Sequence, residues 1–121
     1  MSEFAEFVKE TFQPFGVVTA RKMFSGYGIY YDSMMFGLIA DETLYLKVDK
    51  NTAPLFEIKG LTPFTYNRED KPVKMSYYLA PAEIYDDPAE AIKWAKLALE
   101  AAYRSKSPSK KKSNTRSKIK E

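Results

Sequence analysis

The residue types in this 121-residue chain leave few kinds of active site open. It has no cysteine and no histidine, which excludes thiolate nucleophiles, Ser-His-Asp triads and the usual zinc and iron sites. Catalysis would depend on tyrosine, lysine, serine and the acidic residues, and no Ser-x-x-Lys or paired-carboxylate arrangement stands out among them. The sequence therefore predicts a protein that is not an enzyme and that uses no cofactor.

Two short patterns resemble ligand sites, and each has a simpler explanation. Gly26-Tyr27-Gly28 lacks the third glycine of a dinucleotide-binding loop and the lysine of a phosphate-binding loop, so we expect a hairpin turn that needs positive φ. Glu83, Asp86, Asp87 and Glu90 could surround a hard cation, but helix capping explains Asp87 and Glu90 without one. No nucleotide site and no metal site is predicted.

A third pattern combines cations with tyrosines, as surfaces that bind single-stranded nucleic acid do. Tyrosine is also common in strands, and lysine protects exposed strand edges. Residues 1–103 hold 11 lysines and arginines against 15 acidic residues, and this net negative charge favours the second interpretation. The residues concerned are Arg21, Lys22, Lys47, Lys71, Lys74, Tyr30, Tyr45, Tyr66 and Tyr78.

The C-terminal segment differs in composition from the rest of the chain. All 18 aromatic residues lie at or before Tyr103, whereas residues 104–121 hold eight lysines and arginines against one acidic residue. We predict a folded domain over 1–104 and a basic disordered tail over 105–121, because the tail has too little apolar surface to offset its ordering entropy. Such a tail either binds DNA through counterion release or only keeps the protein in solution. Its candidate DNA contacts are Lys110, Lys111, Lys112, Arg116 and Lys118.

The elements that position these residues follow from hydrophobic periodicity and turn signals. Strands that cluster, rather than alternate with crossover helices, predict an α+β fold in which helices pack on one face of an antiparallel sheet. The predicted elements are a helix over 2–13; strands over 17–24, 28–31, 34–40 and 43–48; a short helix within 49–59; strands over 63–67 and 73–79; and a long helix that begins at Asp87.

Two of these elements have a predicted buried face. Every second residue of the strand from Val73 to Leu79 is apolar, and we predict that this set, which includes Met75 and Tyr77, faces the core. The predicted buried stripe of the long helix consists of Ala91, Ile92, Ala95, Leu99 and Ala102, widened by Trp94 and Ala98.

The chain contains an ordered series of motifs: Arg21–Tyr30, Met35–Asp41, Leu44–Lys47, Pro63–Tyr66, Met75–Tyr78 and the helix start from Asp86 to Ala95. This series resembles the N-terminal domain of the TfoX (Sxy) family of bacterial competence regulators, over about residues 1–103. The family usually has Met-Phe-Gly-Gly where this chain has Met23-Phe24-Ser25-Gly26, so Ser25 replaces the first glycine. Full-length members also carry a second, C-terminal domain, in whose place this chain has the basic tail.

The resemblance implies an α+β fold similar to that of secretion chaperones. It also implies a role in transcription, where TfoX-type proteins act with a cyclic-AMP receptor protein on competence genes. Arg21, Lys47 and Tyr78 fall within the motifs and are candidate surface residues. The prediction is a regulatory domain that contacts a protein of the transcription machinery, with a homodimer as one possible form. The alternative is a nonspecific nucleic-acid binder that uses its tail.

Two features bear on the cellular compartment. No apolar run approaches the roughly 20 residues that a bilayer-spanning helix needs. The first residues include Glu3 and Glu6, where a secretory signal would be basic. We therefore predict a cytoplasmic protein with no membrane partner.

Overall fold

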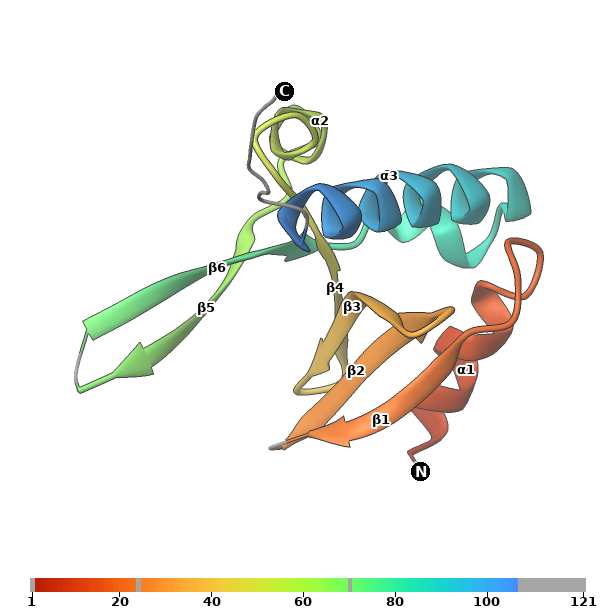
Figure 1. The fold of residues 1–121 in the computed structure, drawn as a ribbon, viewed down its shortest axis with the longest axis horizontal. Coiled ribbons are helices and arrows are strands. Elements are labelled where there is room, and N and C mark those ends of the chain that lie inside the picture. Colours follow the sequence, from red (N-terminus) through yellow and green to blue (C-terminus); the bar gives the residue numbers. More distant parts are fainter. Residues whose placement is uncertain (1, 24, 70, 107–121) are drawn as a thin grey trace, which may run out of the picture.

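The computed structural model describes residues 2–23, 25–69 and 71–106, which form one six-stranded sheet and its helices (Figure 1). Neighbouring strands are antiparallel and lie in the order β1-β2-β3-β4-β6-β5. The predicted α+β class is confirmed. The elements are α1 (Glu3–Thr11), β1 (Thr19–Met23), β2 (Gly26–Tyr31), β3 (Met34–Ala40), β4 (Thr43–Lys47), α2 (Ala53–Glu57), β5 (Pro63–Arg68), β6 (Lys71–Leu79), the 3-10 helix η1 (Ala82–Tyr85) and α3 (Pro88–Lys106).

The long helix α3 packs against β3 and β4, and α1 lies beside β1 (Figure 1). The hairpin of β5 and β6 extends away from the helices. Both helices contribute to one buried cluster on the same side of the sheet, in which Phe12, the C-cap residue of α1, contacts Phe36 of β3 at a ring-centroid distance of 5.5 Å. The helices therefore pack on one face of the sheet, as predicted.

Helix α3 begins at the predicted residue. The side-chain oxygen Oδ1 of Asp87 accepts a hydrogen bond from the backbone N–H of Ala89 at 2.9 Å. Glu90 does not close a capping box with it, because its Oε1 accepts a hydrogen bond from the indole N–H of Trp94 at 3.0 Å. The buried residues of α3 are Ala91, Trp94, Ala95, Ala98, Ala101 and Ala102, whereas the predicted Ile92 and Leu99 are only half-buried.

The C-terminal end of α3 lies beyond the predicted domain boundary. Ser105 and Lys106, which were expected to begin the tail, continue the helix. The candidate DNA contacts Lys110, Lys111, Lys112, Arg116 and Lys118 lie outside the described residues.

Tight turns join β2 to β3 and β3 to β4, and their residues have positive φ, whereas the glycines of Gly26–Gly28 do not. Both residues of the β2–β3 turn, Asp32 and Ser33, have positive φ, at 52° and 72°, which suits the twist of a hairpin. The expected positive φ within Gly26–Gly28 is wrong, because Gly60 is the only described glycine that has one, at +80°. Glycine is required at 26 for space: a Cβ there would lie 1.9 Å from the carbonyl oxygen of Ile39.

We expect Gly26→Ala to lower the free energy of unfolding by about 2 kcal/mol, because the new methyl group would force β2 and β3 apart. Gly60→Ala is the comparison. Nothing lies within 4 Å of a Cβ at Gly60, so only its positive φ strains alanine, at a cost of about 1 kcal/mol. Urea unfolding followed by circular dichroism measures both. A Gly26 variant as stable as the Gly60 variant would contradict the close backbone approach.

Asp49 connects the end of α3 to the loop after β4. Its carboxylate accepts hydrogen bonds from the guanidinium of Arg104 and from the backbone N–H groups of Asn51 and Thr52, the last two at 3.0 and 3.1 Å. The hydrogen bond from Arg104 is the main reason that the pKa of Asp49 lies below its ordinary value. A lowered carboxyl pKa stabilises the fold above the unfolded-state pKa, and this contribution is lost as pH falls through the folded-state pKa.

Arg104→Gln should therefore lower the stability at neutral pH, and the difference should disappear once Asp49 is protonated in both proteins. We expect about 0.5 kcal/mol near pH 7, because the Arg104 side chain is 43% exposed and solvent screens the pair. Lys106→Gln removes the same charge near the end of α3 without this contact, and should change stability little. Urea titrations across the acid range measure all three proteins. A deficit in the Arg104 variant that persists after Asp49 is protonated would contradict the assignment.

Candidate functional site

The two faces of the sheet differ in what covers them. Leu44 and Leu46 of β4 are buried against the helices, so the residues between and beside them point to the opposite face. No helix in the described ranges packs on that opposite face, which we call the open face. The open face consists of Arg21 and Met23 of β1, Tyr30 of β2, Met35 and Leu38 of β3, Tyr45 and Lys47 of β4, Phe64 of β5, and Met75 and Tyr77 of β6.

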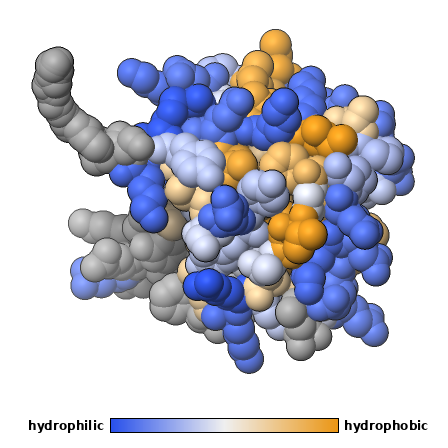
Figure 2. Space-filling model, turned by 45° about the vertical axis from the view of Figure 1, so that its right-hand side comes forward, coloured by the Kyte–Doolittle hydropathy of each residue, from blue (hydrophilic) through white to orange (hydrophobic). Residues whose placement is uncertain are grey.

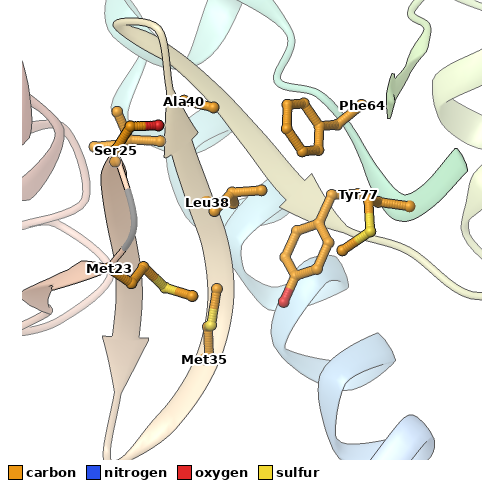
Figure 3. Close-up of a pocket in the computed structure, with 10 residues that line it drawn as sticks. Met23, Ser25, Met35, Leu38, Ala40, Phe64 and Tyr77 are labelled. Atoms are coloured by element: carbon orange, nitrogen blue, oxygen red, sulfur yellow. The ribbon is translucent and has the colours of Figure 1, made fainter. Parts of the chain in front are cut away.

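The open face contains a hollow of about 630 Å³. Figure 3 shows Met35 and Leu38 of β3 on one side of it and Phe64 and Tyr77 on the other. The missing side chain of Gly28 makes room for the methionines, because a Cβ at Gly28 would lie 2.9 Å from the sulfur of Met23. The lining residues are Met23, Ser25, Gly26, Met35, Leu38, Ile39, Ala40, Phe64, Met75 and Tyr77.

Strand β6 turns Met75 and Tyr77 toward the hollow, which is the opposite of the orientation predicted. The alternation from Val73 to Leu79 predicts that Met75 and Tyr77 face the core, and this is wrong. Tyr78 pairs with the buried Leu46 and is itself 3% exposed, so its neighbours point to the open face.

Tyr78 is therefore not a surface residue, and the expectation that it is one is wrong. Its ring packs against Phe56 at a centroid distance of 5.9 Å. Its hydroxyl donates a hydrogen bond of 2.6 Å to Oε2 of Glu57, and this bond, together with burial, raises the pKa of Tyr78. These contacts give Tyr78 a structural role that joins α2 to β6.

Arg21 and Lys47 both lie on the open face, each against a tyrosine ring. The guanidinium carbon of Arg21 lies 4.8 Å from the ring centroid of Tyr30. The ammonium nitrogen of Lys47 lies 5.2 Å from the ring centroid of Tyr77 and donates a hydrogen bond of 2.6 Å to the Ser76 hydroxyl. Contacts of this kind hold a cation in place without neutralising it.

The titration properties of this region reflect its partial burial. Burial lowers the pKa of Lys47, and the negative charge of Asp49 opposes this shift. Burial also raises the pKa of Tyr77, with a further contribution from the neighbouring Tyr30.

This arrangement is suited to binding apolar groups. Methionine side chains are flexible and polarisable, and they adapt to ligands of different shape. Other large apolar side chains that are well exposed lie on other elements, with Val17 before β1 and with Leu55 and Ile58 at α2. On the side of the molecule shown in Figure 2, small apolar patches alternate with hydrophilic side chains. No helix among the described residues has the length and apolar character needed to cross a bilayer.

The sequence and two comparisons identify the family. The family model described as the TfoX N-terminal domain matches residues 10–102. Protein Sxy of Escherichia coli (strain K12) is 24% identical over 106 residues, which cover 88% of this chain and 49% of that protein. The chain thus spans about half the length of this relative. With three quarters of its residues inside the family match, the chain belongs to the TfoX N-terminal domain family.

Proposed function

We propose that this chain is a non-enzymatic regulatory domain that binds a protein of the transcription machinery through the open face and so controls competence-type genes. Membership of the TfoX N-terminal domain family supports the regulatory role. The hollow among Met35, Leu38 and Tyr77 carries the proposal of a binding surface, because the described part of the chain leaves it uncovered. A regulator of this kind acts in the bacterial cytoplasm, as a monomer or as a homodimer.

The size of the hollow limits the binding free energy that it can contribute alone. Burial of one leucine-sized or phenylalanine-sized side chain stabilises a complex by about 1.5–3 kcal/mol. Micromolar affinity corresponds to about 8 kcal/mol. One inserted side chain therefore does not suffice, and a partner must also contact the rim of the open face.

The test is affinity capture from an extract of the source organism, with the full chain as bait and mass spectrometry as the readout. We expect a transcription protein, such as the cyclic-AMP receptor protein or an RNA polymerase subunit, to be retained by the wild type and lost with Leu38→Glu. Ile58→Glu is the matched control, because it places the same charge on an apolar residue that is 87% exposed on another surface. Failure to retain any transcription protein, or equal retention by both variants, would contradict the proposal.

A second candidate function is nonspecific binding of nucleic acid by the tail. It is supported by the charge distribution, with eight cations and one acidic residue in 104–121. The full chain and a 1–106 variant should be titrated with duplex DNA at several salt concentrations. If the tail binds DNA, only the full chain binds, and its affinity falls steeply with salt. Equal binding by the 1–106 variant would exclude the tail as the DNA-binding element.

A further inference from the structure

The open face is polarised, because its two cations with described side chains, Arg21 and Lys47, lie toward one end of the hollow. Tyr30, on which Arg21 lies, pairs with Met35 at the beginning of β3. Lys47 follows Leu46, which pairs with Gly37, so it too lies toward the Met35 end of β3. The structure thus places two cations beside the same end of an apolar hollow.

The opposite end of the hollow has a different character. It is lined by Ser25 and by Ala40, the last residue of β3. The turn that follows Ala40 consists of Asp41 and Glu42, and both are exposed. A ligand on the open face therefore meets positive charge at one end and negative charge at the other.

Neither cation forms an ion pair with another described residue. The ion pairs among the described residues are Lys9 with Glu6, Lys59 with Glu83, and Arg104 with Asp49, and none includes Arg21 or Lys47. Asp49 is the acidic residue that affects Lys47, but its carboxylate is bound by Arg104. A carboxylate from outside would meet two positioned donors that lack an anionic partner in the described domain.

We propose that the partner segment bound by the open face is acidic and amphipathic, with one bulky apolar side chain in the hollow and carboxylates against Arg21 and Lys47. This inference rests on the proposed function, since it specifies the partner of the same surface. It excludes the chain's own tail, which is basic and has Ile119 as its only large apolar residue.

The first experiment selects 12-residue peptides from a random phage-displayed library on the full chain. Peptides that also bind Leu38→Gln, which makes the hollow polar without adding a charge that would itself repel acidic peptides, are removed, so that those retained depend on the hollow. We expect the retained peptides to combine a leucine, phenylalanine or tryptophan with aspartates or glutamates. Enrichment of neutral or basic peptides, or the absence of any peptide that depends on Leu38, would overturn the inference.

The second experiment measures the affinity of the best retained peptide by fluorescence anisotropy. Arg21→Gln and Lys47→Met should each weaken binding by about tenfold, because each removes a charge-assisted hydrogen bond to the peptide. Lys93→Met is the matched control, because Lys93 lies over the Trp94 ring at the same 5.2 Å but on α3. An affinity that is unchanged in both open-face variants would overturn the inference.

The two proposals fail in different ways. Suppose that Leu38→Glu abolishes capture of the transcription protein but that peptide affinity is unchanged in Arg21→Gln and Lys47→Met. The open face then binds a partner of another chemistry. The proposed function then stands and this inference is wrong. If capture is unaffected by Leu38→Glu, the proposed function is wrong even if acidic peptides bind the hollow.

Discussion

Replacing Leu38 with glutamate is expected to weaken partner binding by more than about a hundredfold while the domain stays folded. Leu38 is half-buried and lies at the centre of the open face, between Gly28 of β2 and Tyr45 of β4. In the free domain a glutamate there can extend toward water. In the complex its carboxylate would be buried among methionines and rings without a partner, at a cost of several kcal/mol.

Isothermal titration calorimetry with the purified partner, together with a circular dichroism melt, measures both parts of this prediction. Met35→Gln provides a second variant of similar size, which keeps the test valid if the glutamate variant unfolds. It should weaken binding less, because an uncharged amide costs less to bury. If both variants are folded and bind as tightly as the wild type, the hollow is not the binding site.

Phe56→Ala should lower the free energy of unfolding by about 3–5 kcal/mol, which is much of the stability of a domain this size. Phe56 is fully buried and is the one buried residue of α2. Its ring contacts the Trp94 ring edge-on at a centroid distance of 4.8 Å and lies 5.9 Å from the Tyr78 ring. Its removal leaves a cavity at the point where α2, β6 and α3 meet.

Urea unfolding tests whether Phe56 anchors α2 to the core. The Phe56→Ala variant is compared with Leu55→Ala, which changes a residue of the same helix. Leu55 is 43% exposed, so its truncation should cost less than about 1 kcal/mol. The Phe56 variant should show a much lower unfolding midpoint than the Leu55 variant. Similar midpoints would mean that α2 contributes little to the core.

The parts of the fold that the sequence predicted correctly depend on local signals. The start of α3 is defined by a signal only a few residues long, the N-cap Asp87 followed by proline. The turn at Asp32 and Ser33 separates two apolar runs that become β2 and β3. Local signals of this kind were sufficient for the element order and for the α+β class.

The open face could not be predicted in the same way, because it depends on contacts between distant residues. Tyr77 and Tyr78 are chemically identical, and only the pairing of Tyr78 with Leu46 decides which of them faces the core. The hollow likewise joins residues as far apart in sequence as Met23 and Tyr77. The requirement for glycine at 26 comes from the carbonyl of Ile39, which no local pattern reveals.

Methyl NMR of the full chain labelled at methionine tests the central claim, that the partner binds the open face. Met23, Met35 and Met75 line the hollow, whereas Met34 pairs with Tyr31 and packs against the buried cluster on the helix side. On addition of the captured transcription protein, the methyl signals of the three hollow methionines should shift while that of Met34 stays in place. A shift of Met34 with unchanged signals from the other three would contradict the claim and move the binding site to the helical face.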